Sequence, residues 1–341
     1  MVQFRYKDKL FSLCLHLNSQ QTNTMLKHIK LLFQDFLAFL RQDYKFLPYC
    51  YAALIIVSSI VFIYTTDIGW AIAKGKIPTS NGIVNSVLMF TVIYFLVAVP
   101  VLILQGKYKE ISKPHFYLKG LVLIVFIAIS ANFSWRERLD LSNMSFSEQN
   151  FIFRTIWRMN NIIWVLPVLI LLRIFVDKKI KGLYGLCSGN HHVKAYLSLY
   201  LFTLPILIAV AFTPGFLSYY PMGRPWVFEG LFGNPAWLNT TIYETIYMSD
   251  FIMVELIFRG ALVIGMGTAI GRSAVLPMVA VYVALHFGKP AMETISAIFG
   301  GFFLGTLAFQ TKHIWGGVII HMGIALAIEL IRFVQYYTLG I

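Results

Sequence analysis

The chain has 341 residues, of which 58% are hydrophobic and 13% are charged, and its mean hydropathy is +0.71. Average globular proteins carry about 25% charged residues, so this composition excludes an ordinary soluble enzyme. The net charge of +13 comes from Lys and Arg in loops between apolar runs. That distribution is typical of a membrane topology signal and of contact with anionic lipids. We therefore expect membrane lipids as partners and no nucleic acid.

The N-terminal region comprises residues 1–45. Residues 1–24 are polar and weakly patterned, and we expect them to be poorly ordered. From Met25 to Leu40, apolar residues recur at helical spacing while charged and amide residues fill the other faces. Because this segment is too polar to span a bilayer, the pattern predicts an interfacial amphipathic helix. Met25 is also a candidate alternative start.

The remainder of the chain alternates apolar runs with short polar loops. Runs of about 18–22 apolar residues predict an all-α, polytopic bundle of transmembrane helices, and we expect eight or nine spans. The candidate runs are Phe46–Thr65, Ile83–Leu104, Phe116–Phe133, Thr155–Val176, Ala195–Phe212, Ile242–Ile264, Ala274–His286, Ala291–Phe309 and Ile314–Tyr337.

The runs divide into two parts. Residues 46–241 hold five runs that are almost free of ionisable groups, followed by a loop at 213–241 rich in Pro, Gly and aromatic residues. We interpret them as a transmembrane scaffold with a structured outer loop. Residues 242–341 contain most of the ionisable residues at membrane depth. We interpret this part as a core of catalytic type.

The positions of Lys and Arg predict the orientation. With the N-terminus in the cytoplasm, 18 of these residues lie on the inner side and eight on the outer side. An excess of positive charge on the cytoplasmic side is the usual arrangement, so we expect a cytoplasmic N-terminus.

Residues 250–260, DFIMVELIFRG, place three ionisable side chains inside an apolar run. An ionised side chain at bilayer depth costs at least ~2.5–3.5 kcal/mol on insertion scales, so such residues usually function or are paired. Glu255 and Arg259 are one helical turn apart and can pair on one face. Asp250 precedes Glu255 by about 140° of helix rotation, so we expect it to face elsewhere and to cap or pack near the helix start.

Two further groups at membrane depth are His286 and His321. They are candidates for general bases or oxyanion donors, or for hydrogen-bonded packing residues. No HExxH motif is present, and the three Cys form no CxxC pair, so we expect no cofactor and no tightly held zinc. If a divalent metal such as zinc is used, these two His are its candidate ligands. Glu293 follows Lys289 by four residues and is expected to pair with it at a helix start.

The segments ELIFRG, YVALH and HIWGGVIIH, in this order, resemble the three motifs of the CPBP family. This family comprises the CAAX-protease and bacteriocin-processing membrane proteins, whose motifs are EExxxR, FxxxH and HxxxN or HxxxD. The resemblance covers about residues 242–330. It implies proteolysis within the bilayer, in which a Glu and a His activate a water and another His, with an Asn, stabilises the oxyanion. The catalytic residues that it implies are Glu255, Arg259, His286 and His321.

The chain departs from these motifs at three positions. Val254 stands in place of the first Glu, which is the base that the resemblance implies, and Ala325 stands in place of the final Asn or Asp. Tyr282 replaces Phe, which is a mild change. Either Glu255 acts as the base after a modest rotation of its helix, or the fold persists without protease activity. The expected topology also places His286 near an outer helix end and His321 in an inner half, unless the helix of His286 starts deeper.

The leading interpretation is a membrane-embedded peptidase, a hydrolase that resembles CAAX-processing proteases and acts on a peptide or membrane-associated protein. We expect it in a cytoplasmic membrane of bacterial type. The second interpretation is a non-catalytic protein of the same fold that binds or chaperones a partner. A transporter ranks last, because the sequence shows no internal repeats or matched broken helices.

Overall fold

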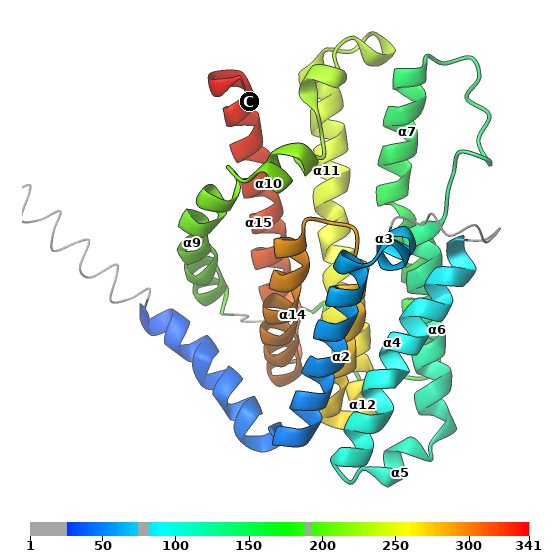
Figure 1. Ribbon diagram of the computed structural model, residues 1–341, viewed down its shortest axis with the longest axis vertical. Coiled ribbons are helices and arrows are strands. Elements are labelled where there is room, and N and C mark those ends of the chain that lie inside the picture. The colour runs from blue at the N-terminus through cyan, green and yellow to red at the C-terminus, as the bar shows by residue number, and fades with distance from the viewer. Residues whose placement is uncertain (1–25, 74–81, 188–191, 341) are drawn as a thin grey trace, which may run out of the picture.

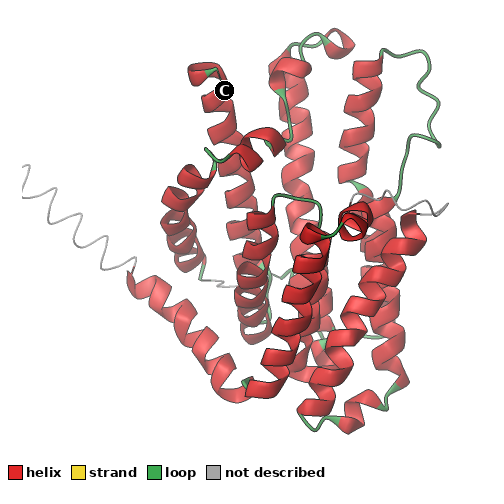
Figure 2. Ribbon diagram, in the orientation of Figure 1, coloured by secondary structure: helices red, strands yellow, loops and turns green. Residues whose placement is uncertain are grey.

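The computed structural model describes residues 26–73, 82–187 and 192–340. Within these ranges the chain forms an all-α bundle with no β-strand, as the sequence predicts (Figure 1, Figure 2). Eight of its helical segments are long and apolar enough to cross a membrane. They are Phe46–Thr65 (α2), Gly82–Leu104 (α4), Pro114–Asn132 (α6), Phe146–Phe175, Val193–Val210 (α9), Ala236–Leu285, Ala291–Thr311 (α14) and Trp315–Leu339.

Some of these segments are composite. The fourth consists of α7 (Phe146–Arg158), a π-helical turn (Asn161–Val165) and α8 (Leu166–Phe175), and it begins nine residues before the predicted Thr155. The last consists of α15 (Trp315–Val334) and the π-helical Gln335–Leu339. Short helices connect the others: α3 (Asp67–Ala73), α5 (Tyr108–Ile111) and α10 (Pro214–Tyr219). The expected outer loop therefore contains helical structure.

The 50-residue segment Ala236–Leu285 contains two of the nine predicted runs. It consists of α11 (Ala236–Glu255), a π-helical stretch (Leu256–Gly265), α12 (Gly267–Ile270), a 3-10 turn (Gly271–Ala274) and α13 (Val275–Leu285). The chain reverses through α12 and Gly271, whose positive φ of 63° suits glycine. Val263 before the reversal and Val275 after it both approach Gly305 of α14. Both arms therefore pack against the same helix.

The second arm of this reversal is short. With 11 residues, α13 rises about 16 Å, roughly half of a ~30 Å hydrocarbon core. The loop after it lies well below the top of α11 in Figure 1. His286 therefore follows a half-length helix, which brings it to the depth of the bundle interior. The helix does not start deeper than the sequence predicts, because α13 begins at Val275, before Pro277. His286 lies inside the bundle because α13 ends after 11 residues.

The main hydrophobic core joins both predicted parts of the chain. It combines buried residues of α2, α4 and α6 with residues of the π-helical stretch and α13.

Small residues permit the close packing of α13 on α14: a Cβ on Gly301 would lie 3.0 Å from the Tyr282 ring, and one on Gly305 would lie 2.4 Å from Met278.

The predicted amphipathic helix is present over residues 26–43. Its buried face packs on α14, where the ring of Phe36 lies 5.3 Å from that of Phe303 and the ring of Phe39 lies 5.9 Å from that of Phe309. Leu26 and Leu37 are exposed on the other side. The predicted tail at residues 1–24 lies outside the described residues.

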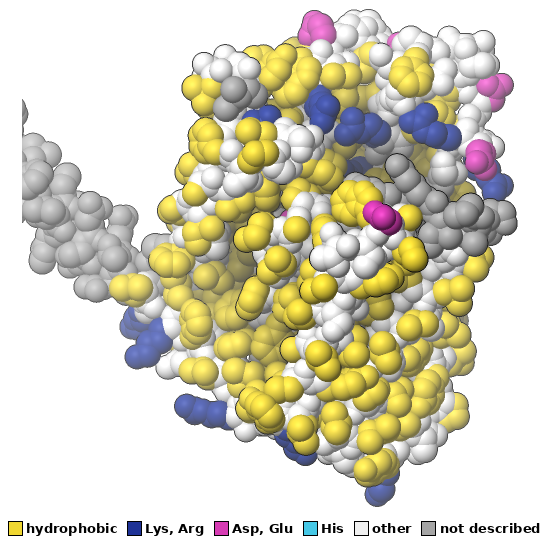
Figure 3. All heavy atoms as spheres, in the orientation of Figure 1, with side chains coloured by type: hydrophobic (Ala, Val, Ile, Leu, Met, Phe, Trp, Pro, Cys, Tyr) yellow, Lys and Arg dark blue, Asp and Glu magenta, His cyan; other side chains and the backbone are white. Residues whose placement is uncertain are grey.

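Several basic residues that we assign to the inner side lie at one end of the bundle. Lys45 donates to the backbone of Gln105, and Lys107 donates to Ser273 at 2.6 Å. Arg272 lies 5.6 Å from the ring of Phe309, near the end of α14. Figure 3 shows hydrophobic side chains covering the middle of one face, with Lys and Arg towards its lower edge and in an upper band. This arrangement fits a membrane-spanning bundle.

Candidate intramembrane site

A cavity of about 800 Å³ lies inside the bundle. Its walls come from α4, α6 and α9 on one hand and from α11, α13, α14 and α15 on the other. Arg259, His286 and His321 line it, together with many apolar side chains. An apolar cavity with a few convergent polar groups is the usual form of a binding or active site.

Glu255 lies at the end of α11, where the helix widens into its π-helical stretch, and is fully buried. Its Oε1 lies 3.0 Å from Nη1 of Arg259, so the predicted pair is present. The same Oε1 lies 3.0 Å from Nδ1 of His321 on α15. A carboxylate oxygen accepts, so the Nδ1–H of His321 donates to Glu255 and Nε2 is the nitrogen left for other partners. Glu255 is not among the described residues that line the cavity.

Gly317 allows α15 to approach this carboxylate. A Cβ on Gly317 would lie 1.8 Å from Oε2 of Glu255, and a Cβ on Gly316 would lie 2.1 Å from the Tyr196 ring. Any side chain at Gly317 would displace the Glu255 carboxylate or α15 and so disturb the contact between Glu255 and His321. The paired glycines are therefore a requirement of the site as well as of helix packing.

His286 is the first residue after α13 and is buried. Its Nδ1 lies 2.8 Å from the backbone oxygen of Tyr282, so Nδ1–H donates there and Nε2 is the free ring nitrogen. The hydroxyl of Thr294 on α14 donates to the His286 carbonyl at 2.8 Å. These two bonds fix the backbone and the ring of His286 independently of any ligand.

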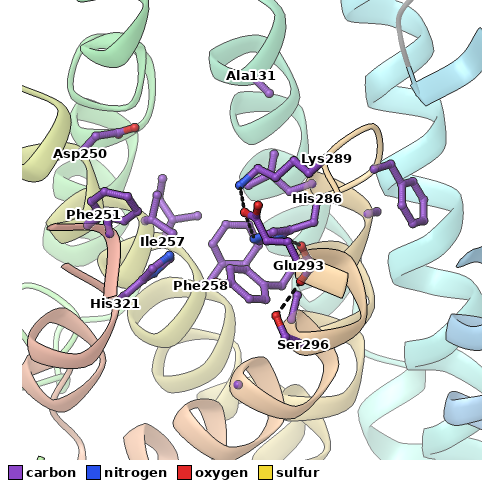
Figure 4. A pocket seen from close by; sticks show the side chains of 18 of the residues that line it. Ala131, Asp250, Phe251, Ile257, Phe258, His286, Lys289, Glu293, Ser296 and His321 are labelled. Atoms are coloured by element: carbon purple, nitrogen blue, oxygen red, sulfur yellow. Dashed lines mark hydrogen bonds and ion pairs between the residues drawn. The ribbon is translucent and has the colours of Figure 1, made fainter. Parts of the chain in front are cut away.

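The ring of Tyr282 lies among the predicted residues. Its centroid is 4.7 Å from that of His286 and 6.3 Å from that of His321. The guanidinium of Arg259 lies over its face, 4.3 Å from the centroid. Tyr282 is therefore a common neighbour of the two histidines, and Figure 4 shows His286 and His321 on different segments around the cavity. The structure thus brings Glu255, Arg259, His286 and His321 into one site.

The prediction that Asp250 lies near a helix start was wrong, although it faces elsewhere than Glu255 as expected. Because α11 begins at Ala236, Asp250 is in the middle of the helix rather than near its start. It lines the cavity (Figure 4), and its Oδ1 accepts from the Asn161 side chain at 2.7 Å. The helix begins at Ala236, in a polar segment that precedes the predicted run at Ile242. The apolar run alone does not indicate this N-terminal extension. Asp250 is also one turn before Val254, so both face the cavity.

Glu293, on the first turn of α14, is a second carboxylate in the cavity. The predicted pair is confirmed, because Lys289 Nζ lies 2.7 Å from its Oε1. The sequence did not indicate its other neighbours: Tyr220 of the outer loop donates to Oε2 at 3.0 Å, and Nε2 of His286 lies 3.9 Å from Oε1. Glu293 follows His286 by seven residues, and this short spacing was the signal in the sequence that the two could lie close together. A loop separates them, because α13 ends before His286 and α14 begins at Ala291.

The motif departures also face the cavity, since Val254 and Ala325 both line it.

A metal fits this set of side chains poorly. In the described part of the chain, no group of three or more His, Cys, Asp or Glu side chains is arranged to hold a metal ion. The expectation about zinc stays a prediction for measurement.

Comparison with protein families gives one match. The family model described as "Type II CAAX prenyl endopeptidase Rce1-like" matches residues 236–327. This segment is similar to that family. It begins with α11 and ends within α15, and so includes Glu255, Arg259, His286 and His321. The resemblance to the CPBP family drawn from the three motifs is thereby confirmed for this part of the chain. Comparisons with curated proteins and with solved structures gave no significant match.

The eight apolar helical segments identify an integral membrane protein, and its residues 236–327 are similar to the CAAX prenyl endopeptidase family model. Apolar side chains of α2, α4 and α9 are exposed on the surface of the bundle, which suits contact with lipid. The first five predicted runs lie outside the matched segment, although α4, α6 and α9 contribute to the cavity wall.

Proposed function

We propose that this protein is an intramembrane endopeptidase that hydrolyses a peptide bond of a membrane-associated substrate bound in the central cavity. The observation that carries the proposal is the 3.0 Å contact between Glu255 and His321 at the wall of a cavity that His286 also lines. The family description of the Rce1-like segment supports the same reaction class.

Peptide hydrolysis needs a base that takes a proton from water and donors that stabilise the oxyanion. His321 and His286 come from different helices and present Nε2 atoms that their backbone or carboxylate partners leave free. We assign the oxyanion to the His321 side, where the contact of Nδ1 with Glu255 fixes the ring and leaves Nε2 as the nitrogen that would bind the oxyanion. We assign the water to the His286 side.

In this assignment Glu255 is a positioning residue. Its carboxylate is enclosed by Arg259, His321 and Gly317, and it acts on the reaction through the His321 ring. A carboxylate in this place fixes the tautomer and orientation of a histidine, as in Ser-His-Asp triads. This role differs from that of a water-activating base, which we considered for Glu255 from the sequence.

The test is cleavage of a panel of membrane-inserted peptides by the purified protein in liposomes. We expect cleavage by the wild type and none above background by His321→Ala. The matched control is His115→Ala, which removes an exposed histidine at the start of α6 and should leave cleavage unchanged. Absence of cleavage by the wild type, or equal cleavage by His321→Ala, would contradict the proposal.

A second candidate is a non-catalytic protein that binds a partner in the same cavity. The observation that favours it is the apolar lining at Val254 and Ala325, where the family motifs carry polar residues. On this alternative, the peptide panel would bind to the wild type without being cleaved, and binding would persist in His321→Ala.

A further inference from the structure

A second carboxylate–histidine pair lies in the cavity, outside the three motifs. Oε1 of Glu293 is 3.9 Å from Nε2 of His286, and both side chains line the cavity (Figure 4). Glu293 comes from α14, and the motif positions on α11 contribute no carboxylate to the cavity at Val254. The pair therefore places a carboxylate beside His286 from a different helix.

The orientation of His286 defines what lies between the two groups. Its Nδ1–H is used by the Tyr282 carbonyl, so the neutral ring presents a lone pair at Nε2 towards Glu293. A lone pair and a carboxylate oxygen do not bond to each other directly. The 3.9 Å separation exceeds a hydrogen bond and suits one bridging water, whose two O–H groups donate to the two acceptors.

The carboxylate itself is fixed on both oxygens. Lys289 Nζ lies 2.7 Å from Oε1, and the Tyr220 hydroxyl donates to Oε2 at 3.0 Å. The ammonium group of Lys289 and the hydroxyl of Tyr220 therefore hold the Glu293 carboxyl group in place beside His286. Tyr64 of α2 donates to the Lys289 carbonyl at 2.7 Å and so holds the loop that carries these groups. An ordinary ion pair at a helix start requires neither Tyr220 nor the approach of His286.

We propose that Glu293 and His286 together bind the hydrolytic water and that Glu293 is the base that accepts its proton. This inference rests on the proposed peptidase function. An O–H bond of the water breaks, its proton passes to Oε1 of Glu293, and the water oxygen bonds to the peptide carbonyl carbon. When the C–N bond breaks, the proton passes from Glu293 to the leaving nitrogen. The products are a carboxylic acid and an amine, and Glu293 returns to its ionised form.

The experiment compares kcat and KM of wild type, Glu293→Gln and Glu293→Asp in the liposome peptide assay. Loss of a general base lowers the rate by about 10²–10⁴-fold, and we expect that loss in kcat for Glu293→Gln with little change in KM. Glu293→Asp keeps the charge and should recover part of the rate. Glu137→Gln, which changes an exposed carboxyl in the loop after α6, is the matched control and should behave as wild type.

Two further measurements separate a base from a structural ion pair. A structural pair predicts equal losses for Glu293→Gln and Lys289→Met, whereas a base predicts a larger loss for Glu293→Gln. Added formate should restore part of the kcat of Glu293→Ala, because a small carboxylate can occupy the space left by the side chain. Melting temperatures in detergent identify any variant that does not fold.

The outcomes for the function and for the inference are distinguishable. Wild-type kcat in Glu293→Gln, with cleavage lost in His321→Ala, would overturn the water-activating pair and leave the peptidase function standing. Absence of cleavage by the wild type would contradict both. A folded Glu293→Ala whose kcat is reduced but not raised by formate, with an equal reduction in Lys289→Met, would show a structural pair and overturn the inference.

Discussion

Oε1 of Glu255 lies 3.0 Å from Nδ1 of His321, across 66 residues of sequence, and joins α11 to α15 inside the bundle. The contact sets which nitrogen of His321 carries a hydrogen and which faces the cavity. It also places a buried carboxylate between a guanidinium and an imidazole, because Arg259 approaches the same oxygen. The stability and the proposed chemistry of the site therefore depend on the same atoms.

The close approach at Gly317 gives the first prediction. Gly317→Ala should abolish cleavage and lower the melting temperature, because the added Cβ would lie 1.8 Å from Glu255 Oε2 and must displace the carboxylate or α15. Gly300→Ala is the matched control for stability, since a Cβ there meets nothing within 4 Å and alanine favours a helix. Unchanged activity and stability in Gly317→Ala would contradict the described approach of α15.

The second prediction concerns the buried ion pair. Arg259→Met should lower the free energy of unfolding by about 3–5 kcal/mol, because it leaves the Glu255 carboxylate buried without its cation. Adding Glu255→Gln should recover part of that loss, since the uncompensated charge is removed. Reversible denaturation in detergent measures both variants, with the exposed Arg41→Met as control. Additive losses in the double variant would show that the two side chains do not interact.

The third prediction is the topology, which the distribution of Lys and Arg favours and the structure leaves open. Reporter fusions ending in residues 177–192 should report a cytoplasmic position, and fusions ending in residues 221–235 should report the opposite side. The reverse pattern would overturn the orientation and would place the N-terminus outside the cytoplasm.

The fourth prediction concerns the metal. Among the described residues, no group of three or more His, Cys, Asp or Glu side chains is arranged to hold a metal ion, so purified protein should carry no stoichiometric zinc. Elemental analysis that found about one zinc per chain, lost in His286→Ala or His321→Ala, would contradict this prediction.

Much of the fold could be predicted from the sequence because membrane helices are encoded by long apolar runs. The same reasoning located Glu255, Arg259, His286 and His321, since ionisable residues within such runs are costly. Helix ends were less predictable. The start of α11 at Ala236 lies in a polar segment, and this is why Asp250 was placed near a helix start rather than in the cavity.

The remaining parts of the site depend on tertiary contacts that carry no local signal. Glu293 follows a loop as an ordinary i,i+4 partner of Lys289, and only the fold brings His286 and Tyr220 to it. The need for glycine at Gly317 comes from its approach to the Glu255 carboxylate, which depends on the crossing of α11 and α15.

The most direct test of the account compares wild type, Glu255→Gln and the double variant Val254→Glu with Ala325→Asn in one liposome preparation. The account predicts cleavage by wild type and a loss of about 10²–10⁴-fold in Glu255→Gln, because Gln removes the charge behind His321 while keeping its shape. It predicts little gain in the double variant, since the cavity already holds its carboxylates. Equal cleavage by wild type and Glu255→Gln, or cleavage by the double variant alone, would contradict it.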